Sequence, residues 1–173
     1  MSRIPMVEPS DEPAELREVF EQLRRTRGRV PGMYRTLAQQ PGVLAAHRAY
    51  FHAALDAGML PRPFKEKIAF KVARLRHSPY CTGSHRSYAL KNGVSAQELE
   101  AIDRSDYMAL APGEAVALEF AEAMTRSRGA VDDALMERLK AHYSAKEIVE
   151  IAALVGIMDL ACTLAATFGL PPD

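Results

Sequence analysis

The stretch HSPYCTGSHRSYALKNG, residues 77–93, contains a cysteine and a histidine at a spacing that could support thiol chemistry. His85 follows Cys81 by four residues, so on a helix the two side chains lie on one face, one turn apart. Ser78 and Pro79 suit the N-cap and the first position of such a helix. Unpaired N–H groups and the helix dipole favour a thiolate there, and a nearby imidazole can return a proton to a leaving group. The pattern therefore indicates a reactive thiol at Cys81.

Spacing alone leaves other interpretations of these residues open. A lone cysteine is more often a small buried residue than a nucleophile. Glu66 precedes Ser78 by twelve residues, and if the two helical segments pack antiparallel its carboxylate could orient His85 and raise its basicity. In the run KEK the same residue would more commonly be a solvated surface charge. A metal site built from Cys81, His85 and Glu66 matches no standard zinc spacing, so we expect neither a metal nor a cofactor.

The composition restricts the classes of partner. The chain has 173 residues, enough for one domain with a sizeable core, and its 22 Lys and Arg residues equal its 22 Asp and Glu residues. This balance favours small molecules or proteins over nucleic acid or an anionic membrane. Two cysteines and no evident signal peptide predict a reducing, cytoplasmic location. The apolar residues 148–170 are interrupted by Asp159 and two threonines, which favours a buried core helix over a membrane span.

Helical periodicity runs through the whole chain and predicts an all-α, single-domain helical bundle. Ser95 with Glu98 and Ser144 with Glu147 have the form of capping boxes. Within residues 62–76, apolar side chains recur at helical spacing, and Lys65, Lys67, Lys71 and Arg74 are expected mostly on the opposite face. The expected helices cover residues 12–27, a short segment between two Pro-Gly breaks, 43–57, 62–76, 79–92, a helix from 96, 112–126, 131–141 and a helix from 145.

At these residues the sequence resembles the carboxymuconolactone decarboxylase family, and within it the alkyl hydroperoxidase D-like branch. The family pattern is a Glu, about a dozen residues, and then Cys-x-x-Cys-x-x-x-His; here these positions hold Glu66, Ser78, Cys81 and His85. The segments RVPGMYRTLAQQPGVLAAH and LAPGEAVALEFAEAMTR are also similar to family segments, and YSAKEIVEIAALVGIMDLACTLAATFGLP is similar to the final helix pair. The resemblance covers most of residues 29–173, with residues 1–28 as an N-terminal segment and first helix of the same compact unit.

The resemblance implies an all-helical fold that assembles as a homo-oligomer, a trimer or a hexamer, with the site near the subunit boundaries. In the hydroperoxidase branch the second Cys attacks a hydroperoxide, the first Cys resolves the sulfenic acid, and Glu and His relay protons. By position, Cys81 is then the attacking thiol, with His85 and Glu66 as the relay. Tyr80, Cys162 and Asp159 are candidate pocket-lining residues, and the implied role is that of an antioxidant oxidoreductase of the peroxidase type.

Ser78 is the departure from this pattern, because serine can cap the helix but cannot form a disulfide. The protein could be a one-cysteine peroxidase whose sulfenate is resolved by an external thiol reductant. It could instead perform non-redox proton transfer, as a decarboxylase or isomerase of a small lactone or carboxylic acid, or be a non-catalytic protein that binds a ligand or partner. The serine could also be an engineered replacement. Cys162 is a candidate substitute resolving thiol, although a structural role in the core is the simpler interpretation.

Overall fold

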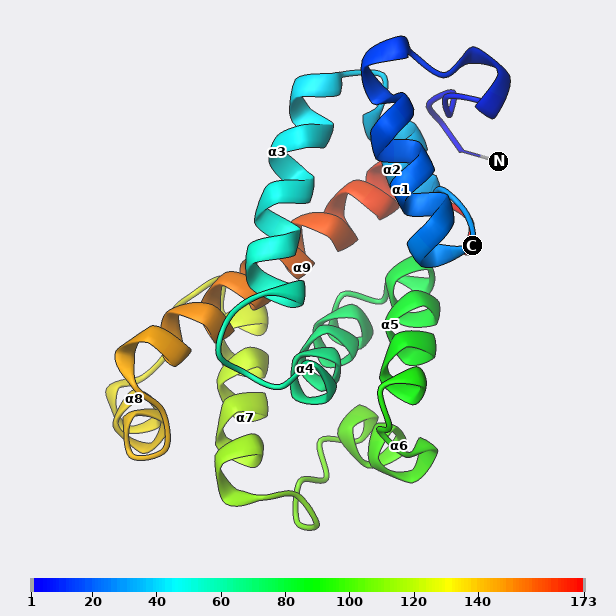
Figure 1. Cartoon of the computed structure of the whole chain (residues 1–173). Helices are drawn as coiled ribbons and strands as arrows, with labels where there is room; N and C mark the ends of the chain where they lie inside the picture. The colour runs from blue at the N-terminus through cyan, green and yellow to red at the C-terminus, as the bar shows by residue number, and fades with distance from the viewer. Residues whose placement is uncertain (1, 173) are drawn as a thin grey trace.

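The computed structural model describes residues 2–172, which fold into a bundle of helices (Figure 1). Four of these helices begin at a serine or aspartate whose side chain caps the first turn. Both capping boxes form: Ser95 and Ser144 each accept from the backbone of the glutamate three residues later, whose side chain accepts in return. Gly28 ends the first helix in the left-handed region, at φ 76°. The α-helices are α1 (Arg17–Arg27), α2 (Gly32–Leu37), α3 (Pro41–Phe51), α4 (Arg62–Leu75), α5 (Pro79–Lys91), α6 (Ala96–Asp103), α7 (Pro112–Arg126), α8 (Asp133–Lys140) and α9 (Ala145–Phe168).

Two predicted helices are shorter than their hydrophobic patterns suggest. Residues Pro9–Asp11 and Ala14–Leu16 form separate 3₁₀ turns, so α1 begins five residues later than expected from the helix over 12–27. The α3 pattern continues into a π-helical turn, His52–Asp56, where the N–H of Ala57 bonds to the carbonyl of His52. In both cases the sequence predicts which side chains face the core. It does not predict whether the backbone hydrogen bonds have the spacing of a 3₁₀, an α or a π turn.

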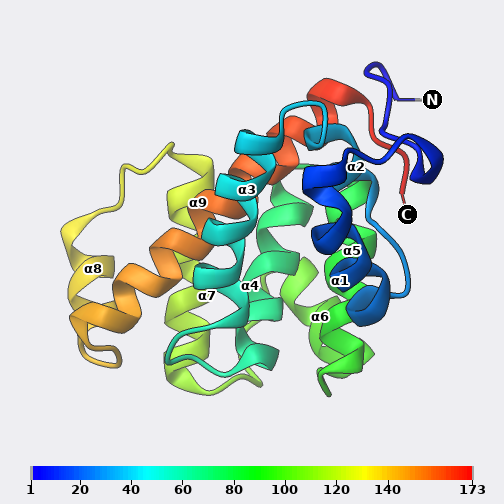
Figure 2. The same cartoon turned by 45° about the horizontal axis from the view of Figure 1, so that its top comes forward.

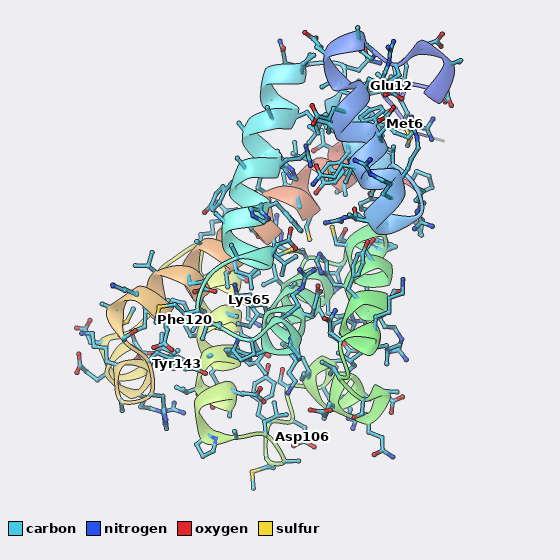
Figure 3. The ribbon with its side chains drawn as sticks, in the orientation of Figure 1. Met6, Glu12, Lys65, Asp106, Phe120 and Tyr143 are labelled. Carbon is cyan, nitrogen blue, oxygen red and sulfur yellow. The ribbon has the colours of Figure 1, made fainter. Side chains whose placement is uncertain are left out.

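Helix α4 lies in the middle of the bundle, where it contacts α5, α6, α7 and α9 (Figures 1 and 2). The expectation that its basic side chains face solvent is wrong for Lys65, Lys67 and Lys71, which are all buried. Each is paired with a carboxylate from a surrounding helix: Lys65 with Glu150, Lys67 with Glu98 and Glu114, and Lys71 with Glu122. Figure 3 labels Lys65 beside α4 within the bundle. Helices on every side leave α4 no solvated face, so its charges are neutralised by ion pairs.

A tight turn between α4 and α5 positions the two helices that carry the motif. Helix α4 ends at Leu75, and His77 adopts a left-handed conformation with φ 49°. The N–H of Ser78 then bonds back to the carbonyl of Ala73. The chain reverses within three residues, so α5 packs against α4 as predicted.

Helix α9 is one continuous helix of 24 residues, so the expected final pair of helices is wrong. It is long and apolar enough to cross a membrane by length and composition, with 44% of its most apolar window buried. In the structure it contacts α3, α4, α5, α7 and α8, and the side chains that it buries include Ile151, Leu154, Ile157, Met158 and Cys162. The prediction of a core helix agrees with this packing.

The N-terminal segment packs on the same core as the other helices. Phe20 and Leu23 of α1 are buried, and the N–H of Arg3 bonds to the carbonyl of Phe168 at the end of α9. The two ends of the chain therefore lie side by side (Figure 1).

Gly58 gives a stability prediction for the turn before α4. Its φ is +99°, and a Cβ at this position would clash with the carboxylate of Glu150, whose Oε2 and Oε1 accept from the N–H groups of Met59 and Leu60 respectively. We expect Gly58→Ala to lower the free energy of unfolding by about 3 kcal/mol, because it adds backbone strain and displaces this half-buried carboxylate. Urea denaturation measures the loss. The control is Gly28→Ala, at φ +76° with nothing within 4 Å, which should cost only about 1 kcal/mol; equal losses would contradict the account.

Candidate active site

Cys81 lies in the first turn of α5, as the N-cap pattern predicts. The Ser78 hydroxyl accepts a hydrogen bond from the backbone N–H of Cys81 at 3.4 Å. Both residues are buried, with Cys81 only 3% exposed. The thiol therefore sits where unpaired N–H groups and the helix dipole stabilise negative charge.

Glu66 and His85 form the contact that the sequence predicted between α4 and α5. His85 Nδ1 lies 2.7 Å from Glu66 Oε2, and Glu66 is fully buried rather than a solvated charge of the KEK run. Burial alone would raise the pKa of Glu66, but the hydrogen bond and charge of His85, together with Arg62, lower it. An ionised carboxylate can only accept, so Nδ1 carries the proton, and Nε2 is the nitrogen left for Cys81 or a substrate.

Arg62, which the sequence analysis did not single out, holds the other oxygen of Glu66. Its Nε donates to Glu66 Oε1 at 2.8 Å, and it also pairs with Asp56. Successive ion pairs and a hydrogen bond thus join Asp56 to Arg62, Arg62 to Glu66 and Glu66 to His85. His85 lines the same cavity as Cys81. An i, i+4 pair of Arg and Glu was visible in the sequence, but pairs of this kind are common on solvated helices and carry little functional signal.

Cys162 of α9 is buried and lies close enough to Cys81 that each thiol is the main influence on the pKa of the other. The hydrogen bond from Cys162, helped by the Ser78 hydroxyl and by the charge of His85, lowers the pKa of Cys81 to about 7 although burial opposes the shift. The hydrogen bond to Cys81 and burial both raise the pKa of Cys162 above its ordinary value. The pair therefore consists of a thiolate at Cys81 and a protonated donor at Cys162.

A cavity of about 300 Å³ opens onto Cys81 and His85. Its walls come from α2, α3 and α5, with contributions from the end of α1 and from α9. Aromatic rings dominate the lining: Tyr34, His47, Phe51, Tyr80 and Tyr88. This volume is at the small end of ligand pockets, so the cavity suits a small, largely apolar or aromatic molecule.

The same cavity is lined by basic side chains, and none of the described residues that line it is Asp or Glu. Arg27 lies over the rings of Tyr34 and Tyr88, at 5.7 and 5.4 Å from the ring centroids, and Lys91 lies over Tyr88. Arg29 also lines the cavity. Within residues 2–172 these three cations have no carboxylate partner, in contrast to Arg62. The entrance therefore favours a ligand that carries negative charge.

His47, which the sequence analysis missed, faces this cavity from α3 without a hydrogen-bond partner among the described residues. The residue is only 7% exposed, and both Nδ1 and Nε2 lack a partner. Burial lowers its pKa, so the ring is neutral near pH 7. Its ring stacks on Phe51 and meets Tyr34 edge-on. Because buried polar groups in proteins normally have partners, the unpaired ring indicates a position for a ligand group.

Of the three candidate pocket-lining residues, one lines the cavity and two do not. Tyr80 lines the cavity, and its hydroxyl accepts from the N–H of Met33 at 3.0 Å. Cys162 and Asp159 do not line it: Cys162 is buried, and Asp159 pairs with Arg76. Residues 161 and 162 follow each other on α9, but only Ala161 reaches the cavity. Among residues 2–172 no group of three His, Cys, Asp or Glu side chains is arranged to hold a metal ion.

A family comparison and the fold agree with this site. The sequence model of the carboxymuconolactone decarboxylase family matches residues 41–123, which include Glu66, Ser78, Cys81 and His85. The fold matches an uncharacterized peroxidase-related protein from Silicibacter sp. TM1040 with a TM-score of 0.88 and 25% identity, over 98% of this chain and 90% of that one. The segment that carries the candidate site therefore matches the carboxymuconolactone decarboxylase family.

Proteins with similar sequences carry different names. The uncharacterized protein YnjA of Escherichia coli is 29% identical over 60% of this chain and 58% of its own length. The alkyl hydroperoxide reductase Rv2159c of Mycobacterium tuberculosis is 32% identical over 49% of this chain. The matched segments therefore span little more than half of the first relative and 25% of the second.

The helical fold is that of an alkylhydroperoxidase AhpD core. A peroxidase-related protein from Ralstonia eutropha with this core has a TM-score of 0.89 and 23% identity, over 99% of this chain and 92% of that one. The debrominase Bmp8, in complex with 2,3,4-tribromopyrrole, has a TM-score of 0.86 and 22% identity, over 98% and 91%. One fold thus accommodates proteins described by different reactions.

Proposed function

We propose that this protein is a thiol-dependent peroxidase-like oxidoreductase in which Cys81 reduces a small organic hydroperoxide. The observation that supports this most strongly is the placement of Cys81 between an activating environment and a cavity. The hydrogen bond from Cys162 and the other neighbours lower the pKa of Cys81 to about 7, and the same residue lines the cavity. Thiolate and access to substrate are the two requirements of a reactive cysteine.

The proposed reaction begins with attack of the Cys81 thiolate on the terminal oxygen of the hydroperoxide. The S–O bond forms as the O–O bond breaks, and the alkoxide leaves with the proton that Nε2 of His85 took from the Cys81 thiol when the thiolate formed. The products are a sulfenic acid on Cys81 and an alcohol. Glu66, at 2.7 Å from Nδ1, holds the imidazole in position and stabilises its protonated form before transfer.

The cavity favours a substrate with an apolar or aromatic body and a negative group. Tyr34, Phe51 and Tyr88 would contact the body, and Arg27 would attract the negative group. His47, neutral and unpaired, would hydrogen-bond a polar atom of the substrate. Carboxylated aromatic hydroperoxides have this chemistry.

Peroxide consumption with an external dithiol tests the proposal. The substrates are hydrogen peroxide, cumene hydroperoxide and a carboxylated cumene hydroperoxide, and the rate of the dithiol alone is subtracted. We expect kcat/KM to be highest for the carboxylated aromatic compound and lowest for hydrogen peroxide. No consumption above the dithiol background with any of the three would overturn the proposal.

Two other functions remain to be compared in the same assay. Bmp8 shares only the fold, but a thiolate beside an aromatic cavity could also remove bromine from a bromopyrrole, so 2,3,4-tribromopyrrole is a useful additional substrate. Non-redox decarboxylation or isomerisation would use His85 and leave Cys81 incidental. Activity that survives replacement of Cys81 would favour this alternative, and a cavity that only binds a ligand would show saturation without turnover.

The pH dependence of Cys81 reactivity follows from its lowered pKa. The thiolate is the reactive form, so the rate of alkylation by iodoacetamide should rise with pH, reach half its maximum at about pH 7 and level off above pH 8. An ordinary thiol would reach half its maximum about 1.5 pH units higher. Mass spectrometry of the alkylated peptide measures the rate at Cys81 alone. A midpoint near pH 9 would show that the neighbours do not activate this thiol.

Assembly and location stay predictions from the resemblance and the composition. We propose a cytoplasmic homo-oligomer, a trimer or a hexamer. Exposed apolar side chains on α9, such as Val149 and Leu160, are consistent with contacts between copies.

A further inference from the structure

We propose that Cys162 is the internal resolving cysteine of this protein, so that one catalytic cycle ends in a disulfide between Cys81 of α5 and Cys162 of α9. This inference rests on the proposed function of Cys81, and it names the residue that replaces the thiol missing at Ser78. The two cysteines are 81 residues apart in the sequence, so no local motif connects them.

The position of Cys162 carries the inference. It is a buried thiol on a helix that packs against α5, and it neighbours Cys81 closely enough that each shifts the pKa of the other, whereas Ser78, at the resolving position of the family pattern, can offer only a hydroxyl. Helices α5 and α9 pack directly against each other. Neighbouring cysteines on two packed helices can reach bonding geometry by side-chain rotation, whereas distant cysteines would need the backbone to move.

The two cysteines differ in their access to the cavity, which gives them different roles in the reaction. Cys81 lines the cavity, where a hydroperoxide would arrive, but Cys162 does not and is 2% exposed. A substrate therefore meets Cys81 first, and Cys162 is shielded from it. The Cys81 sulfenic acid would then be approached from behind by Cys162, on the side opposite the cavity.

The two steps balance in atoms and electrons. In the first, hydroperoxide oxidises Cys81 to a sulfenic acid, and the alkoxide takes a proton from His85. In the second, Cys162 sulfur attacks Cys81 sulfur, the S–S bond forms, and hydroxide leaves with the thiol proton of Cys162 as water. The two thiols lose two electrons in total to the hydroperoxide, and an external thiol or dithiol returns them when it reduces the disulfide.

Oxidation of Cys81 in the first step removes the main cause of the raised pKa of Cys162. The hydrogen bond to the Cys81 thiolate is the largest cause of the raised pKa of Cys162, followed by burial and by the negative charge of Cys81. A sulfenic acid is neutral, so the charge disappears once Cys81 is oxidised, and the pKa of Cys162 falls. Cys162 is thus a hydrogen-bond donor before oxidation and a nucleophile after it.

A single addition of cumene hydroperoxide, in equal amount to the reduced protein and without external thiol, tests the inference. Samples with and without dimedone, which traps sulfenic acids, are analysed by intact mass and by non-reducing peptide mapping. In the wild type we expect loss of two hydrogens and a peptide linked through Cys81 and Cys162. In Cys162→Ser, we expect the dimedone adduct at Cys81, with a sulfenic acid lifetime at least ~100-fold longer because the neighbouring thiol is gone.

The choice of serine keeps the comparison interpretable. Serine keeps the size of the side chain and a hydroxyl that can donate a hydrogen bond, so the variant removes the second sulfur with little change in packing. Wild-type protein that accumulates the Cys81 adduct and no linked peptide would overturn the role of Cys162 while leaving the proposed function intact. A Cys81 thiol that stays unoxidised in both proteins would overturn the proposed function, and the resolving role with it. The wild-type result decides the question even if Cys162→Ser folds poorly.

Discussion

Replacement of Cys81 by serine should reduce the rate of hydroperoxide consumption by about 10³-fold or more, because the side chain that attacks oxygen is lost. A serine side chain fits the same space and can still accept hydrogen bonds in the first turn of α5. Its pKa is far too high for it to ionise near pH 7, and it cannot carry a sulfenic acid. The measurement is kcat/KM for cumene hydroperoxide with an external dithiol.

Thr82→Ser is the matched control for this variant. Thr82 follows Cys81 in the same helical turn but does not line the cavity, so its rate should stay within about twofold of wild type. Thermal unfolding of both variants checks that the fold is kept. Equal rates for Cys81→Ser and wild type would rule out the thiol mechanism and favour proton transfer by His85.

Replacement of Glu66 by glutamine should lower kcat/KM by about 100-fold, because the amide neither fixes the proton on Nδ1 nor stabilises an imidazolium. The carboxylate oxygen lies 2.7 Å from His85 Nδ1, and the side chain is fully buried. His85 is one of the groups that lower the pKa of Cys81, so an imidazole that is no longer held in place should let the half-maximum of Cys81 alkylation move above pH 7. The pH profile of alkylation and the kcat/KM of the variant measure the two effects separately.

A second variant, Glu114→Gln, tests whether the effect of Glu66→Gln comes from its contact with His85 or from a general loss of stability. Glu114→Gln removes an ion pair with Lys67 of α4, but Glu114 lies on α7 and does not line the cavity. This variant should keep the wild-type pH profile even if it unfolds at a lower temperature. A shift of the alkylation profile in Glu114→Gln as large as in Glu66→Gln would indicate a general electrostatic effect of α4 rather than a specific contact.

The motif helix and its partners were predicted because their signals are local. Ser78 and Pro79 specify the start of α5 by capping chemistry, and four-residue spacing then places His85 on the face of Cys81. The contact to Glu66 required one additional assumption, an antiparallel return of the chain, and the tight turn at His77 supplies it. Short-range rules were sufficient for this part of the site.

The parts of the site that the sequence did not predict depend on contacts between distant segments. The burial of Lys65 arises because α9 brings Glu150 to it, and no pattern within α4 indicates that partner. The ring of His47 is unpaired only because α3 places it against Phe51 and the cavity rather than against a polar group. The sequence named Cys162 as a candidate resolving thiol, but whether it lies near Cys81 depends on how α9 packs against α5.

The most direct test of a reactive thiol at Cys81 is the amount of hydroperoxide consumed in a single turnover. Reduced protein is mixed with excess cumene hydroperoxide without external thiol, and the remaining hydroperoxide and the state of Cys81 are followed together by titration and peptide mass spectrometry. We expect a rapid phase that consumes about one hydroperoxide per chain while Cys81 is oxidised in parallel, and this phase should be absent in Cys81→Ser. Hydroperoxide that persists while the Cys81 thiol remains intact would contradict the account.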